Sequence, residues 1–190
     1  MSKKIILCVV LLLVSSLAPS SAKKKKTAKK AAPQTEQRYQ EIDNYDFLYS
    51  GEDYIYQDNY AAIDNLMDEA FKHIGARYRS GAKGPSAFDC SGFTSYVYSK
   101  MMNKSIGASS RDQYARNTPI RNDEIQTGDL VFFTSPNSGR GVGHVGIVVD
   151  VDPLTGSFDF IHASSSNGVK VSNSRDGYYS RRYIGARRVN

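Results

Sequence analysis

All strand-like segments of this chain follow its helical segments, and this order constrains the fold more than any other feature. A first apolar pattern with helical spacing covers 63–74, after a capping residue at Asp58 or Asn59, and a second covers 91–102. Short apolar segments typical of strands come next, at 129–133, 144–150, 158–163, 169–172 and 183–189. Helices first and strands afterwards indicate an α+β domain over 58–190, with N-terminal helices packed on a central antiparallel sheet.

The first 22 residues have the pattern of an export signal. Lys3 and Lys4 precede an apolar segment at 5–17, and the small residues at 20–22 suit cleavage by a signal peptidase. This apolar segment is shorter than the ~20 residues that a membrane-spanning helix needs. We therefore expect residues 1–22 to be removed as a signal peptide and the protein to be exported.

Residues 23–57 have an unusual composition and separate the signal from the domain. Lys23–Lys30 holds six lysines, and residues 23–38 contain few large apolar side chains, which is typical of a linker. Residues 39–57 are acidic and rich in tyrosine, and we expect an arm that packs along the domain or lines a groove. On an exported chain, the lysines favour contact with anionic wall polymers or lipid headgroups over nucleic acid. A solvated tether is the alternative.

Cysteine usage points to a nucleophile. Cys8 lies inside the export signal, so Cys90 is the one cysteine that the mature chain would keep. A single thiol cannot form an internal disulfide, and it is a liability in an oxidising compartment unless it has a task. Cys90 stands at a predicted helix N-terminus, where free N–H groups and the helix dipole stabilise a thiolate. The alternative is a small buried side chain.

A thiol nucleophile needs a base, and the chain offers three histidines. His73 lies beside the apolar face of the first helix, so we expect a structural role or exposure. If Asp150 pairs with Gly156 in a hairpin, His144 stands opposite His162, with Cβ atoms about 5 Å apart. One histidine could then act as general base while the other orients it.

Two alternatives remain for these residues. The histidines could be half-buried sheet residues without a function. Cys90, His144 and His162 could also be three ligands of a zinc ion, although the sequence offers no close-spaced ligand pair and no evident fourth ligand.

Four segments, in order and at matching spacing, resemble the signature segments of NlpC/p60 cell-wall peptidases. They are Phe88–Phe93, Gly128–Phe133, Gly143–Ile147 and Ile161–Ser164, and the resemblance spans 63–189. The resemblance implies a papain-like fold and a Cys-His-His triad without a cofactor. Within that triad it implies Cys90 as nucleophile, His144 as base and His162 as the third polar residue.

Other positions also match the family. Tyr78 matches a tyrosine whose hydroxyl faces the active site, and Asp89 and Ser91 match residues that in relatives help to hold the substrate peptide. Ser80 departs from the common pattern, which has an aromatic residue at that place. The resemblance therefore implies Tyr78, Asp89 and Ser91 as substrate-binding residues.

The end of the chain, at 167–172, 179–183 and 186–189, resembles the single-domain murein endopeptidases of Gram-negative bacteria, of the Spr type. This resemblance implies an enzyme that cuts D-alanyl–diaminopimelate cross-links in peptidoglycan stem peptides. We expect the exported protein to be periplasmic or associated with the cell envelope, and to be a monomer. A γ-D-glutamyl–diaminopimelate endopeptidase of the same fold is the first alternative. A non-catalytic cell-wall-binding module is the alternative from another class.

Overall fold

The computed structural model describes residues 51–190. The predicted signal peptide at 1–22, the lysine-rich linker and most of the tyrosine-rich arm lie outside these residues and stay predictions. No helix in the described part of the chain is long and apolar enough to cross a membrane.

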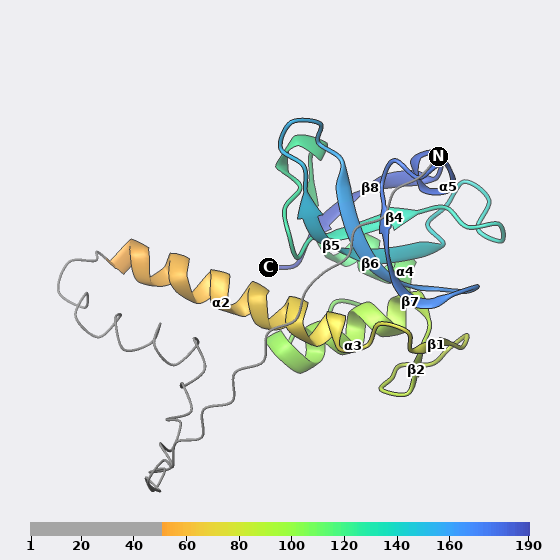
Figure 1. Ribbon diagram of the computed structural model, residues 1–190, viewed down its shortest axis with the longest axis horizontal. Helices are drawn as coiled ribbons and strands as arrows, with labels where there is room; N and C mark the ends of the chain where they lie inside the picture. Colours follow the sequence, from red (N-terminus) through yellow and green to blue (C-terminus); the bar gives the residue numbers. More distant parts are fainter. Residues whose placement is uncertain (1–50) are drawn as a thin grey trace, which may run out of the picture. The chain divides into compact units, whose positions relative to one another are not determined.

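Two helices begin the described domain. Helix α2 (Gly51–Phe71) starts at Gly51 rather than at the predicted Asp58, so the end of the tyrosine-rich segment is helical. The prediction started too late because it rested on apolar periodicity, which the first two turns lack. Helix α3 (Cys90–Met102) begins one residue before the predicted bound. Figure 1 shows the two helices running side by side along one side of the sheet, and Leu66 of α2 and Val97 of α3 share one core.

The connection between these helices contains two short strands that the sequence did not reveal. Strand β1 (Arg77–Tyr78) pairs in parallel with β2 (Ala87–Phe88), which leads directly into α3. Gly92, in the first turn of α3, lies so close to the Ala82 carbonyl that a Cβ atom would overlap it. The loop before α3 therefore packs tightly against the start of the helix.

Six strands of the described domain form one antiparallel sheet in the order β3-β8-β4-β5-β6-β7. The strands are β3 (Thr118–Ile120), β4 (Leu130–Phe133), β5 (His144–Val151), β6 (Phe158–Ser164), β7 (Gly168–Asn173) and β8 (Tyr183–Arg188). Five of them coincide with the predicted segments to within one residue at each end, and β3 is additional. The shorter elements α4 (Ser110–Arg116), η2 (Asn122–Glu124) and α5 (Gly177–Ser180) lie in the connections.

Side chains of the sheet alternate between two cores. Phe132 and Ile147 belong to the core that α2 and α3 cover, whereas Phe133 and Phe160 belong to a second core on the other face. His162 follows Phe160 by two residues on β6, and successive side chains of a strand point to opposite faces. His162 therefore lies on the face of the second core, and its ring is 5.0 Å from that of Phe160 between centroids.

The register of the β5–β6 hairpin differs from the prediction. Asp150 pairs with Asp159, not with Gly156, and the register shifts by a bulge between Val148 and Asp150. The pairing of the two strands continues beyond Asp150, because the Asp152 N–H donates to the Ser157 carbonyl at 2.8 Å. The hairpin loop therefore begins two residues later in the chain than expected. His144 is consequently not directly opposite His162 but is displaced along the strand, and the displacement is an even number of residues, which keeps both on one face.

Candidate active site

Asp89 fixes the start of helix α3 and with it Cys90. One carboxylate oxygen accepts hydrogen bonds from the Gly92 N–H at 2.6 Å and the Ser91 hydroxyl at 3.1 Å. The other accepts from the Gly81 N–H at 2.8 Å, which ties the preceding loop to the helix. An Asp at the N-cap satisfies helix N–H groups that have no partner within the helix. Cys90 is therefore held at a defined position by the cap.

The surroundings of the half-buried Cys90 favour the protonated form of its thiol. Burial, assisted by the negative charge of Asp89, raises the pKa of the Cys90 thiol above its ordinary value. Backbone hydrogen bonds from Cys90 itself, Ser91 and Val145 oppose this shift without reversing it. The helix N-terminus supplies the stabilising N–H groups that the sequence predicted, but desolvation outweighs them. Cys90 consequently needs a base to become a nucleophile.

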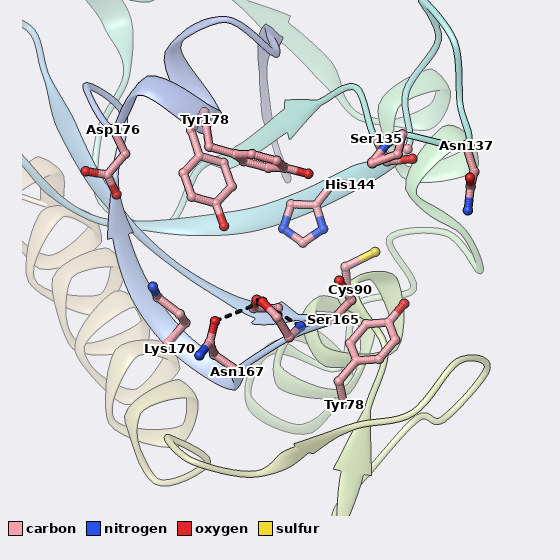
Figure 2. A pocket seen from close by; sticks show the side chains of 15 residues that line it. Tyr78, Cys90, Ser135, Asn137, His144, Ser165, Asn167, Lys170, Asp176 and Tyr178 are labelled. Atoms are coloured by element: carbon pink, nitrogen blue, oxygen red, sulfur yellow. Dashed lines mark hydrogen bonds between the residues drawn. The ribbon is translucent and has the colours of Figure 1, made fainter.

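His144 stands next to this thiol at the first residue of β5. The backbone of its neighbour, Val145, hydrogen-bonds to Cys90. Figure 2 shows the His144 imidazole beside the Cys90 side chain, and both line the same cavity. Burial lowers the pKa of His144, which keeps its ring neutral at neutral pH. A neutral imidazole is the form that can accept a proton.

His162 lies behind His144 and has no exposed surface. Its Nδ1 is 2.9 Å from Nε2 of His144, and its Nε2 is 3.0 Å from the Ser172 hydroxyl and 3.2 Å from that of Tyr179. Burial, and then the charges of His144 and Lys170, lower the pKa of His162. A neutral His162 that donates from Nε2 accepts at Nδ1, which places the His144 proton on Nε2 and leaves His144 Nδ1 free to act as a base.

Ser172 and Tyr179 were not assigned to the site from the sequence. Tyr179 precedes β8 in the short helix α5 and packs its ring against Phe160 and His162, at 4.9 and 5.3 Å between centroids. Ser172 is buried on β7, where it pairs with Phe160. Strand register brings the Ser172 hydroxyl to His162, and the packing of α5 brings that of Tyr179. Spacing along the chain shows neither, so the sequence carried no direct signal for them.

A cavity of about 540 Å³ opens between these elements (Figure 2). It is lined by Tyr78, Cys90, Ser135, Pro136, Asn137, Gly143, His144, Ser164, Ser165, Ser166, Asn167, Lys170, Asp176, Tyr178 and Tyr179. Burial and the nearby Cys90 and Asp89 raise the pKa of Tyr78, which therefore stays a neutral phenol facing the thiol. Asp89 and Ser91 are not among the lining residues, because their polar atoms serve the cap of α3.

The remaining histidine lies elsewhere. His73 of α2 is 3.0 Å from the Glu69 carboxylate, and its ring centroid is 5.0 Å from that of Phe88. Over the described residues, no group of three or more His, Cys, Asp or Glu side chains is arranged to hold a metal ion.

Comparison with known proteins supports this view of the domain. A family model described as the NlpC/P60 family matches residues 75–188. The probable endopeptidase p60 of Listeria grayi is 41% identical over 133 residues, which are 70% of this chain and 24% of that protein. The murein DD-endopeptidase MepS/murein LD-carboxypeptidase of Escherichia coli K12 is 34% identical over 124 residues, which are 65% of this chain and 61% of that protein. The chain thus spans less than two thirds of the length of these relatives.

Solved structures give the same result for the fold. The NlpC/p60 domain of the peptidoglycan hydrolase SagA is 33% identical, with a TM-score of 0.55, over 67% of this chain and 98% of that one. A Staphylococcus aureus Mu50 protein described as similar to lipoprotein, of the NLP/P60 family, is 36% identical with a TM-score of 0.59, over 68% of this chain and 41% of that one. These likenesses confirm the predicted α+β fold.

Proposed function

Because this chain belongs to the NlpC/P60 family, we propose that it is a peptidoglycan hydrolase, a cysteine endopeptidase that acts outside the cytoplasm. One observation carries the proposal: a half-buried thiol and a neutral imidazole line one cavity, and the imidazole is hydrogen-bonded to a second, buried histidine. The names of the p60, MepS and SagA relatives, which refer to endopeptidases and a peptidoglycan hydrolase, agree with this activity.

In the proposed reaction, Cys90 attacks the carbonyl carbon of a peptide bond. His144 Nδ1 takes the thiol proton, and the sulfur forms a bond to that carbon. The backbone N–H groups at the start of α3 can stabilise the negative charge that develops on the carbonyl oxygen. The His144 imidazolium then gives its proton to the leaving amine, and water hydrolyses the thioester with His144 again acting as base.

His162 keeps the base in one orientation. Its Nδ1 accepts a hydrogen bond from the Nε2–H of His144, so that Nδ1 of His144 carries no proton and can act as the base. The buried hydroxyl of Ser172 and that of Tyr179 hold His162 in turn. Tyr78 lies at the cavity wall next to Cys90, where its neutral hydroxyl can donate a hydrogen bond to the substrate.

We propose that the bond cleaved is the D-alanyl–diaminopimelate cross-link. The resemblance of the C-terminal segments to Spr-type enzymes and the likeness to an E. coli murein DD-endopeptidase favour this bond. Cleavage of the γ-D-glutamyl–diaminopimelate bond is the second candidate, because the p60 relative is described only as an endopeptidase. A wall-binding module without activity is disfavoured by the joint presence of Cys90, His144 and His162.

Digestion of purified muropeptides, with products identified by mass spectrometry, tests the proposal. Release of monomers from cross-linked dimers indicates the D-alanyl–diaminopimelate bond, and shortened monomers indicate the second bond. The Cys90→Ala variant should lose several orders of magnitude in rate while it keeps the melting temperature of the parent. Peptidoglycan binding without any cleavage would contradict the proposed activity, and Cys90→Ala activity within tenfold of the parent would contradict the mechanism.

A further inference from the structure

The cavity carries two opposite charges that the proposed mechanism does not use. Lys170 of β7 and Asp176, which precedes α5, are the ammonium and the carboxylate among its lining residues. Figure 2 shows Lys170 and Asp176 at opposite edges of one end of the cavity, with Cys90 toward the other end. A peptide that places a bond at Cys90 would extend toward this charged end.

Neither charge is neutralised by another side chain. The ion pairs within residues 59–190 include neither Lys170 nor Asp176, although the two lie on the same cavity. The Asp176 carboxylate accepts one long hydrogen bond, from the Asn173 N–H at 3.4 Å. The Lys170 ammonium makes no hydrogen bond to any described residue. Two unpaired opposite charges held apart on one wall can bind a ligand that carries both charges.

The backbone fixes where Lys170 can reach. Lys170 pairs with His162 across β6 and β7, so the two side chains share a face of the sheet. Its side chain is half-buried, which reduces the freedom of the ammonium group. The neighbouring lining residues Ser164, Ser166 and Asn167 are neutral and can add hydrogen bonds without adding charge. This end of the cavity is therefore polar, with one site of each sign.

We propose that Lys170 and Asp176 form a subsite for a zwitterionic amino-acid group on the substrate, a carbon that bears both a free carboxylate and a free ammonium. Lys170 binds the carboxylate and Asp176 binds the ammonium. The inference rests on the proposed function. In a D-alanyl–diaminopimelate cross-link, the side-chain amine of the acceptor diaminopimelate is acylated and becomes the leaving amine. The zwitterionic group is therefore that of the donor diaminopimelate, which precedes the cleaved D-alanine and keeps both charges at the end of its side chain. A lysine side chain at that place has the ammonium alone, and an amidated diaminopimelate lacks the carboxylate charge.

A simpler role for Lys170 makes a different prediction. The Lys170 charge also lowers the pKa of His162, so its removal could alter catalysis without any contact to the substrate. Such an effect would act equally on every substrate that is cleaved at Cys90. A subsite, in contrast, changes the ratio between substrates that differ only in the charge of one group.

The test uses three synthetic cross-linked murein dimers that contain the same D-alanyl–diaminopimelate bond and differ only in the donor diaminopimelate. Its side chain ends in the free amino-acid group, in the side-chain carboxamide, or in the N-acetylated amine. We would measure kcat/KM with the parent, Lys170→Gln and Asp176→Asn. Lys104→Gln and Asp150→Asn serve as matched controls, because both residues lie outside the cavity lining. Binding of the same peptides to Cys90→Ala, measured by calorimetry, gives a readout that does not depend on cleavage.

We expect the parent to prefer the zwitterionic peptide by about tenfold over each derivative, since charged hydrogen bonds at a partly exposed site have this magnitude. Lys170→Gln should remove the preference for the zwitterionic peptide over the carboxamide. Asp176→Asn should remove the preference for the zwitterionic peptide over the N-acetyl peptide. Both control variants should keep both preferences. Equal binding of the three peptides by Cys90→Ala, or an equal loss on all three in Lys170→Gln, would overturn the subsite. If the parent cleaves none of the peptides but Cys90→Ala still binds the zwitterionic peptide more tightly than the derivatives, the proposed function is wrong and the subsite stands.

Discussion

His144 Nε2 and His162 Nδ1 lie 2.9 Å apart, and this hydrogen bond joins a ring at the cavity wall to a ring without exposed surface. The two ring planes are nearly perpendicular, at 89°. The bond occupies one nitrogen of each ring, so only the remaining nitrogen of His144 can exchange a proton with the cavity. The two histidines therefore have unequal tasks although they are neighbours.

Asparagine at each position separates these tasks. His144→Asn should abolish hydrolysis, because an amide cannot take the thiol proton at neutral pH. His162→Asn should keep measurable activity, because an amide can still provide one hydrogen bond that orients His144. Since His162 is fully buried and bonded at both nitrogens, His162→Asn should also lower the free energy of unfolding by about 1–3 kcal/mol.

Turnover of a muropeptide dimer, together with urea unfolding of each variant, checks this prediction. Activity has to be compared at a temperature where both variants are folded, so that the difference in stability does not affect the measured turnover. Survival of His144→Asn with loss of His162→Asn would reverse the assigned roles.

The hydroxyl groups of Ser172 and Tyr179 provide a second test of the histidine network. Both lie within 3.2 Å of His162 Nε2, so each can replace the other as acceptor. Ser172→Ala and Tyr179→Phe should therefore each lower kcat/KM by less than about tenfold. The double variant leaves a buried N–H unpaired, at a cost of about 1–3 kcal/mol, or roughly 5–150-fold in rate.

A double-mutant cycle on kcat/KM measures this redundancy. The expected coupling is a double-variant loss larger than the sum of the single losses in free energy. Tyr179→Phe retains the ring that packs on Phe160, so any loss of kcat/KM in this variant comes from the missing hydroxyl and not from lost ring packing. Additive losses would mean that the two hydroxyls do not share the task.

The sequence specified the fold class and most of the sheet because apolar alternation and turn residues are local signals. It placed five strands correctly but gave a wrong pairing of β5 with β6. The register depends on a bulge near Val149 and on hydrogen bonds within the loop at 152–157, neither of which apolar periodicity encodes. Strands β1 and β2, of two residues each, are too short to form a pattern.

The sequence was sufficient to select the site residues that are chemically distinctive. A lone cysteine at a helix start and two histidines on neighbouring strands are visible in the sequence, and the structure brings Cys90 and His144 to one cavity. Serine and tyrosine are common residues, so Ser172 and Tyr179 could not be selected before β7 and α5 were placed beside β6. The elevated pKa of Cys90 was also missed, because burial depends on tertiary packing rather than on helix position.

The protonated resting state of Cys90 has a consequence for its reactivity. Because burial raises the pKa of the thiol above the ordinary value of 9.0, the alkylation rate with iodoacetamide should still be increasing with pH at pH 9. Hydrolysis should have a different profile. It depends on neutral His144, whose pKa is lowered to about 4, and should stay near its maximum at pH 6.

Alkylation rates followed by mass spectrometry between pH 5 and 10, beside hydrolysis rates in the same buffers, test this pair of expectations. A plateau of the alkylation rate below pH 7 would instead indicate a preformed thiolate–imidazolium pair. His144→Asn serves as the control, since it should leave the alkylation profile almost unchanged if the resting thiol is protonated.

Acid should destabilise the fold through the buried histidine pair. The pKa of His162 is lowered from 6.5 by burial and by the charges of His144 and Lys170, so the unfolded chain binds a proton that the folded chain refuses. The stability that neutral His162 contributes is therefore complete above pH 6.5 and is lost as pH falls below it, by about 1.4 kcal/mol per pH unit for each proton. His162→Asn should reduce the dependence of the free energy of unfolding on pH between pH 6 and pH 5. Ile161→Val, which only removes a buried methyl group, is the control. It should lower the free energy of unfolding by about 0.5–1.5 kcal/mol at every pH and leave the dependence on pH unchanged. Urea unfolding of the three proteins across this pH range decides the matter, because equal slopes would mean that His162 is protonated in the folded state.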